Sequence, residues 1–365
     1  MERSEILGWL RETSPGRLES LWHRADRVRQ EHVGGEVHLR GLIEVSNYCV
    51  RQCLYCGLRA GNAQLPRYRM TPEEVLNCAR LAVQLGYGTV VLQAGEDDGL
   101  DAETIAGIVR QIKAETPLAV TLSLGERSPD ELALWRRAGA DRYLLRFETS
   151  NRTLYERIHP PRRDRNYHRL ELLAELRRLG YQVGSGVMIG IPGQTYADLA
   201  TDIALFAELD LDMIGVGPYL PHPFTPMGGG RVIDDAGDEQ VPADELTTYK
   251  VIALARLVCP RSNIPATTAL ATLNRRSGRE LGLTRGANVV MPNLTPARYR
   301  QLYEIYPNKA CVSETAEDCH GCLRGRIAAI GRTVGRGRGD AVRGTVPLQA
   351  STSGDEFAPQ ELRPN

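Results

Sequence analysis

Short apolar segments alternate with longer amphipathic segments over most of the chain, from residue 37 to residue 293. The apolar segments are short and nearly continuous, which is typical of parallel strands buried on both faces. The eight predicted strands span residues 37–45, 88–93, 118–124, 142–148, 181–190, 211–219, 263–268 and 287–293. Strands that alternate with helices in this way predict an α/β fold, a complete (β/α)8 barrel. An open, doubly wound sheet is the alternative.

The chain divides into four predicted regions. Residues 1–36 carry apolar side chains at helical spacing and predict an N-terminal helical cap. The barrel is expected over residues 37–308, and a region that contains cysteines follows over residues 309–330. Residues 331–365 are rich in glycine, arginine, serine and proline, and we expect a disordered C-terminal extension there.

The charge balance argues against a nucleic-acid or membrane partner. Lysine plus arginine and aspartate plus glutamate number 45 each, so no net field attracts polyanions. No run of 18 apolar residues is present, and charges interrupt the N-terminal segment where a secretory signal would be apolar. We therefore expect a cytoplasmic protein that acts on a small molecule.

Three cysteines follow the first predicted strand: Cys49, Cys53 and Cys56, with the spacing C-x3-C-x2-C. Cytoplasmic thiols stay reduced, so a metal site is favoured over disulfides. A structural zinc site is closed by four ligands, whereas a cubane iron-sulfur cluster held by three thiolates leaves one iron open. An open iron suits catalysis, and a zinc loop with three thiols is the alternative.

This spacing, with Tyr55 just before the last cysteine, resembles the radical S-adenosylmethionine (SAM) enzymes. The resemblance implies a 4Fe-4S cluster whose open iron binds SAM and, on reduction, cleaves it to a 5′-deoxyadenosyl radical. It also implies cofactor contacts at strand ends. Ala94, Gly95 and Glu96 correspond to the turn that holds the SAM amino group, and Glu148 corresponds to a ribose or amine contact. Arg169 corresponds to the contact with the SAM carboxylate. Gly190 and Gly193 would allow the adenine to approach the backbone closely, and Tyr55 would lie on the adenine side.

Longer stretches resemble one family of these enzymes more closely. The motifs "VLQAGED", "GIPGQT", "GPYLPHPFTP" and "YRQLYEIYPNKACV" are similar to HydE, a radical SAM maturase of FeFe-hydrogenase, and the similarity extends from Val37 to Cys322. The family implies H-cluster assembly on a small iron complex that carries cysteine, carbon monoxide and cyanide. It also implies an electron donor and other maturases, including a scaffold GTPase, as partners. The alternatives are a methylornithine synthase-like enzyme with an amino-acid substrate and a non-catalytic iron-sulfur cluster-binding protein.

Inward-facing polar residues near the strand ends are the candidate substrate contacts: Gln93, Thr121, Arg142, Arg146, Thr267, Thr268 and Met291. Strand alternation puts Arg142, Arg146 and Glu148 on one face of the fourth strand. Charges inside a barrel are costly without partners, so we expect a bound anionic or zwitterionic ligand near them. The alternative is that either arginine only pairs with Asp141 or Glu148 at the strand end.

A second group of cysteines follows the barrel: Cys311, Cys319 and Cys322, with the spacing C-x7-C-x2-C. The HydE resemblance implies an accessory 2Fe-2S or 4Fe-4S cluster there. A zinc site completed by His320 and unligated thiols are the alternatives.

Overall fold

The structure is a computed structural model and describes residues 1–162, 167–229 and 236–342. Within these ranges, strands and helices alternate as the sequence pattern predicted. The strands are β1 (Glu36–Ser46), β2 (Thr89–Ala94), β3 (Ala119–Ser123), β4 (Arg142–Leu144), β5 (Gln182–Ser185), β6 (Met188–Ile189), β7 (Met213–Ile214), β8 (Gly217–Pro218), β9 (Val289–Val290) and β10 (Thr333–Val334).

Several helices begin at residues whose side chains cap the first turn. At the start of α3 and of α5, a Thr71–Glu74 pair and a Ser128–Glu131 pair each form a capping box, which satisfies free backbone N–H groups. The helices are α1 (Arg3–Arg11), α2 (Pro15–Val33), α3 (Pro72–Gln84), α4 (Ala102–Glu115), α5 (Pro129–Arg137), α6 (Arg152–Ile158), α7 (Arg169–Arg178), α8 (Tyr196–Glu208), α9 (Glu245–Val258), α10 (Thr268–Leu273), α11 (Gly278–Leu283), α12 (Ala297–Arg300) and α13 (Ala316–Ala329).

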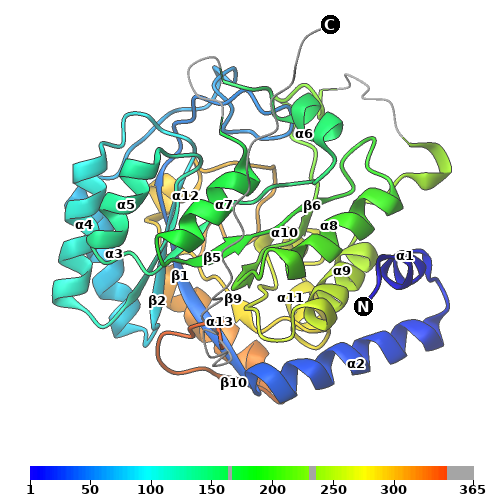
Figure 1. Cartoon of the computed structure of the whole chain (residues 1–365). Coiled ribbons are helices and arrows are strands. Elements are labelled where there is room, and N and C mark those ends of the chain that lie inside the picture. Colours follow the sequence, from blue (N-terminus) through cyan, green and yellow to red (C-terminus); the bar gives the residue numbers. More distant parts are fainter. Residues whose placement is uncertain (163–166, 230–235, 343–365) are drawn as a thin grey trace, which may run out of the picture.

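The strands form a curved parallel sheet in the order β10-β1-β2-β3-β4-β5-β7, and β9 also pairs with β1. Helices lie outside this sheet (Figure 1). Single parallel bridges, Met213 to Asn263 and Pro265 to Val289, continue the path from β7 towards β9. The parallel α/β architecture is thereby confirmed as a half-barrel. Complete closure stays a prediction, because single bridges stand in for a continuous strand at residues 263–265.

The N-terminal helices pack beside the barrel. Helix α1 contacts α8 and α9, and α2 lies along α9 (Figure 1). Ile6, Leu10 and Leu21 are fully buried in these contacts. Over the described ranges, the helices are all too short or too polar to cross a membrane.

A C-terminal segment, residues 335–340, lies across the amino ends of the strands; we call it the barrel-end segment. The carbonyl of Arg338 accepts hydrogen bonds from Thr89 and Arg142, and the carbonyl of Gly339 accepts one from Arg40. Residues 331–342 are therefore ordered against the barrel, in contrast to the disorder predicted from residue 331. The remainder of that predicted tail lies outside the described residues.

Arg142 binds this segment and not a substrate. Its fully buried guanidinium pairs with Asp340 at 2.6 Å and also donates to Thr89 at 2.9 Å and Gln182 at 3.1 Å. Burial by itself raises the pKa of Asp340, but the hydrogen bond from Arg338 and the charge of Arg142 outweigh it and hold the pKa at about 2. The predicted substrate contact of Arg142 is corrected, because Arg142 begins β4 and so lies at the opposite end from the strand ends that carry a site.

We expect Arg142→Met to lower the free energy of unfolding by about 2 kcal/mol, because four acceptors lose their donor. Urea denaturation measures the change. The control is Arg338→Met, whose side chain is 39% exposed in its ion pairs and should cost less than about 1 kcal/mol. If Arg142→Met had wild-type stability but no longer bound SAM, Arg142 would belong to the active site after all.

Candidate active site

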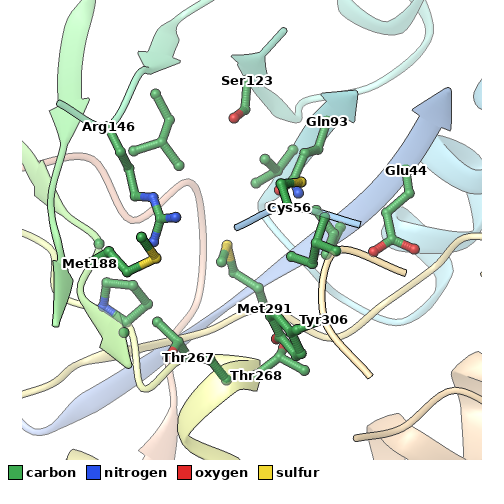
Figure 2. Close-up of a pocket in the computed structure, with 18 of the residues that line it drawn as sticks. Glu44, Cys56, Gln93, Ser123, Arg146, Met188, Thr267, Thr268, Met291 and Tyr306 are labelled. Atoms are coloured by element: carbon green, nitrogen blue, oxygen red, sulfur yellow. The ribbon is translucent and has the colours of Figure 1, made fainter. Parts of the chain in front are cut away.

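A cavity of about 360 Å³ lies on the inner side of the curved sheet and is lined by residues from most of the strands. This size suits a small molecule. In Figure 2, the side chains of Arg146, Met188, Thr267 and Met291 face one space from different segments of the chain. Active sites of parallel α/β barrels lie at the carboxyl ends of the strands, so this cavity is the candidate active site.

The three predicted cluster ligands come together at this cavity. Cys49, Cys53 and Cys56 lie on the loop that follows β1, and all three line the cavity as free thiols. Backbone hydrogen bonds tie this cysteine loop to the residues that follow β2 and to the end of α6. The loop thus presents three sulfur atoms to one space.

Gly95 allows the cysteine loop to approach β2. A Cβ at this position would lie 2.3 Å from Tyr48 O and 2.7 Å from Cys49 Cβ, and no real side chain tolerates such distances. The neighbouring Ala94 and Glu96 line the cavity. The predicted turn therefore has two roles, since its glycine makes room for the loop and its acid faces the cavity.

Burial keeps the three thiols protonated in the absence of a metal. It raises the pKa of Cys49 and of Cys53, and it raises the pKa of Cys56 to about 12. A bound metal ion reverses this preference, because it stabilises the thiolate directly. Three free thiols that line one space fit an iron-sulfur cluster, whose ligands are thiolates.

A buried ion network lies beside the cysteine loop. Arg51 lies 3.3 Å from Glu96 and 3.5 Å from Glu126, and its guanidinium reaches His159 Nδ1 at 2.5 Å. Arg169 donates to Glu126 at 2.9 Å and reaches His159 Nε2 at 2.6 Å. The oxygen and nitrogen atoms of the two acids and His159 are close enough to suit a metal ion. The two guanidiniums already pair with them, so the group forms an ion network.

Two carboxylates of the site have acceptor atoms to spare. Both oxygens of Glu96 and Oε2 of Glu148 are buried and accept no hydrogen bond, although Arg146 pairs with Oε1 of Glu148 at 3.1 Å. Burial, and then the charge of Glu126, raises the pKa of Glu96. Unsatisfied buried acceptors are costly and are normally matched by a donor. A ligand with amino or hydroxyl groups would provide one, as SAM does.

Known proteins match both the sequence and this arrangement. The family model for the radical SAM superfamily matches residues 43–206. Over 325 residues, the chain is 48% identical to the FeFe hydrogenase maturase subunit HydE of Thermotoga maritima, and the alignment covers 89% of this chain and 89% of that protein. The chain belongs to the HydE family. It is therefore a radical SAM enzyme of FeFe-hydrogenase maturation, a class that uses a 4Fe-4S cluster and SAM.

Two solved structures share the fold. The crystal structure of methylornithine synthase (PylB) superposes with a TM-score of 0.75 at 25% identity, over 92% of this chain and 94% of that chain. HydG, a maturase of the FeFe-hydrogenase, superposes with a TM-score of 0.72 at 20% identity, over 90% and 71% of the two chains. These structures confirm the radical SAM fold of this HydE-family chain.

The structure places most predicted SAM contacts at the cavity. The residues that line it are Tyr55, Ala94, Glu96, Glu148 and Arg169. Gly190 and Gly193 instead face the segment before α9. A Cβ at Gly190 would lie 2.4 Å from Ala243 Cα, and the N–H of Gly193 donates to Gln240 at 2.8 Å. The predicted adenine contact of these glycines is corrected, because neither lines the cavity and both N–H groups already donate to glutamine side chains.

The predicted substrate contacts other than Arg142 all line the cavity: Gln93, Thr121, Arg146, Thr267, Thr268 and Met291. Thr121 is 1% exposed and its hydroxyl has no partner, which leaves it available to a ligand. Gln93 donates to the hydroxyl of Tyr303 at 3.2 Å. Thr267 caps α10 through its side chain, so part of its role in this HydE-family chain is structural.

Three buried residues of the site, Arg51, Glu126 and His159, were not predicted from the sequence. A buried pair, Lys309 and Glu44 at 2.7 Å, also lines the cavity. One signal was available for Arg51: residues 45–72 contain four arginines and no acidic residue, so a buried arginine there needs acids from elsewhere in the chain.

The second cysteine group lies partly at the same cavity. Cys311 and Cys319 line it, whereas Cys322 is exposed. A hydrogen bond from Cys319 lowers the pKa of Cys311, which Arg279 also approaches at 3.5 Å. His320 contacts the hydroxyl of Tyr87 at 3.2 Å. The accessory cluster of the HydE family stays a prediction for these cysteines.

We expect Arg51→Met to destabilise the protein before cluster loading by about 3 kcal/mol, because two buried carboxylates lose their shared cation. Urea denaturation at neutral pH measures the loss. The matched control is the adjacent Gln52→Ala, since Gln52 is exposed and should cost less than about 1 kcal/mol. Equal losses in the two variants would show that the ion network does not stabilise the site.

Proposed function

We propose that this enzyme acts on a small iron complex ligated by cysteine, carbon monoxide and cyanide during assembly of the H-cluster. The observation that supports this substrate class is the cavity of about 360 Å³, in which the cysteine loop and several polar side chains face one space. Arg146, Lys309 and Thr121 supply donors there. Such donors suit cyanide, carbonyl and carboxylate groups.

Cys49, Cys53 and Cys56 would hold the 4Fe-4S cluster. When bound, the cluster and SAM supply a 5′-deoxyadenosyl radical inside the cavity. Oε1 of Glu96 pairs with Arg51 at 3.3 Å, and its Oε2 is a buried acceptor that suits the SAM amino group. Arg169 makes three contacts through its five N–H donors, so N–H groups are left for the SAM carboxylate.

Glu148 and Tyr55 would complete the SAM site. Oε2 of Glu148 is a buried, unpartnered acceptor and suits a ribose hydroxyl. Tyr55 lines the same cavity and offers an aromatic face to the adenine side. Burial, and then the charges of Arg169 and Arg51, lower the pKa of His159, so its imidazole is neutral and adds no positive charge. One ring nitrogen of a neutral imidazole accepts a hydrogen bond, so His159 accepts from one of the two guanidiniums that lie beside it.

An amino-acid substrate is the second candidate. The solved structure of methylornithine synthase shares the fold over 92% of this chain. The cavity also holds two pairs of opposite charge, Glu44 with Lys309 and Glu148 with Arg146, which would suit a zwitterion.

The proposed partners follow from the same reaction. As a HydE-family member, the enzyme works with other hydrogenase maturases. We propose that a scaffold GTPase receives the product and that an electron donor reduces the cluster. We also propose that the reaction takes place in the cytoplasm, where the eight free cysteines of this enzyme would stay reduced.

We expect Cys53→Ala to abolish cubane loading and SAM cleavage, because Cys53 is a buried ligand of the cysteine loop. The measurement is 5′-deoxyadenosine formed after anaerobic reconstitution, with dithionite and SAM. Cys319→Ala, the control, should keep cleavage within about two-fold of wild type. An intact cubane in wild type with no 5′-deoxyadenosine would refute the proposed chemistry.

Complementation separates the two substrate classes. The protein would be co-expressed with the other maturases and apo-hydrogenase, and hydrogen evolution would be scored. Hydrogen evolution that depends on Cys53 supports the iron complex. SAM cleavage without hydrogen evolution, together with a rearranged amino acid, would favour the methylornithine synthase-like reaction.

A further inference from the structure

A buried carboxylate behind the cavity connects two strand-end loops. Asp202 of α8 is 0% exposed, and its Oδ1 accepts hydrogen bonds from the backbone N–H of Ser150 at 2.6 Å and from the Ser150 hydroxyl at 2.5 Å. Its Oδ2 receives the side-chain amide of Gln194 at 3.5 Å. One side chain therefore contacts the loop after β4 and the loop after β6.

Gln194 extends this connection to the cavity wall. Its amide nitrogen also donates to Met188 O at 3.1 Å, and its amide oxygen accepts from the N–H of Gly190 at 2.8 Å. Met188 lines the cavity, and its own N–H donates to Glu148 O at 3.0 Å. Asp202 therefore binds the loop that follows Glu148, and Gln194 binds β6, whose first residue donates to the Glu148 carbonyl.

Glu148 has a strained backbone. Its φ is 65°, in the left-handed region that residues with side chains rarely adopt. The N–H of Thr149 donates to Phe147 O at 2.8 Å across it, a tight turn of the uncommon γ type. Such strain persists only where surrounding contacts enforce it, and it concentrates at functional sites. The residue after this turn is Ser150, which Asp202 binds twice.

We propose that Asp202 is a positioning residue that enforces the strained turn at Glu148 and so aims the Glu148 carboxylate into the cavity for SAM. The inference rests on the proposed role of Glu148 in SAM binding. No ion pair to a cation is found for Asp202 within the residues that the structure describes. Hydrogen-bond donors of the loop after β4 and of Gln194 stabilise this carboxylate in the protein interior.

An amide cannot replace this carboxylate. Asp202→Asn keeps one oxygen for Ser150, but its NH₂ group would face the NH₂ group of Gln194. Gln194 would then have to turn and give up its bonds to Gly190 and Met188. The isosteric change therefore tests the arrangement of donors and acceptors and leaves the volume unchanged.

The experiment measures the equilibrium Kd for SAM on the reconstituted, unreduced holoenzyme by calorimetry, at about pH 8.5. This is above the pKa of Asp202, which burial raises to about 7. We expect Asp202→Asn to raise the Kd roughly ten-fold. At saturating SAM, the rate of 5′-deoxyadenosine formation should change less than the Kd.

Asp198→Asn is the matched control. Asp198 lies on the same helix, caps its first turn and contacts Asn151. The substitution Asp198→Asn should lower the melting temperature of the protein, while the Kd for SAM stays at the wild-type value. If Asp202→Asn does not fold, Ser150→Ala removes only the hydroxyl bond and should raise the Kd roughly three-fold.

A double variant gives the decisive result. If Asp202 acts through Glu148, adding Asp202→Asn to Glu148→Gln raises the Kd little further. Additive effects, or a wild-type Kd in Asp202→Asn, overturn the inference. Failure of the wild-type holoenzyme to bind and cleave SAM would instead refute the proposed function.

Discussion

Arg51 makes the contact on which the active site depends, because it ties the cysteine loop to the barrel by charge. It pairs with Glu96 and Glu126, which follow β2 and β3, and it meets His159 after α6. Arg169, at the start of α7, contacts the same acid and imidazole from the other side. Burying these charges is costly and is offset only while every partner is present, so the network specifies one arrangement of the loop.

The two ends of the barrel use buried charge differently. At the amino end, the guanidinium of Arg142 has protein acceptors for its donors, and the barrel-end segment supplies two of them. At the carboxyl end, Glu96 and Glu148 keep buried oxygen atoms that accept no hydrogen bond. Buried acceptors without a hydrogen bond fit a ligand that contributes the donors. The predicted cofactor contacts Tyr55, Glu96, Glu148 and Arg169 all line the cavity at this end.

The strained turn at Glu148 makes the site depend on residues that do not line the cavity. A left-handed backbone at a residue with a side chain requires external support, and Asp202 with Gln194 supplies it from behind the cavity. Glu148, which lines the cavity, is thus supported by Asp202, which is fully buried outside the cavity. The division resembles metal sites, in which outer residues orient the groups that touch the ligand.

Local sequence was sufficient for much of this protein. The alternation of apolar and amphipathic segments predicted the parallel α/β fold, and local capping pairs such as Thr71 with Glu74 begin its helices. The spacing of Cys49, Cys53 and Cys56 on a loop after the first strand predicted three sulfur ligands at one site, and all three line the cavity. These features depend on backbone hydrogen bonding and on neighbours within a few residues, so a sequence pattern expresses them directly.

Only the tertiary structure decided which inward-facing polar residues meet a ligand and which meet protein. Arg142 and Arg146 look equivalent in the sequence, yet Arg142 binds Asp340, 198 positions away, and Arg146 faces the cavity. Gly190 likewise leaves a space that Ala243 occupies. The physical reason is that a buried polar group must find its partner wherever the chain brings one, and the position of that partner is a property of the folded chain.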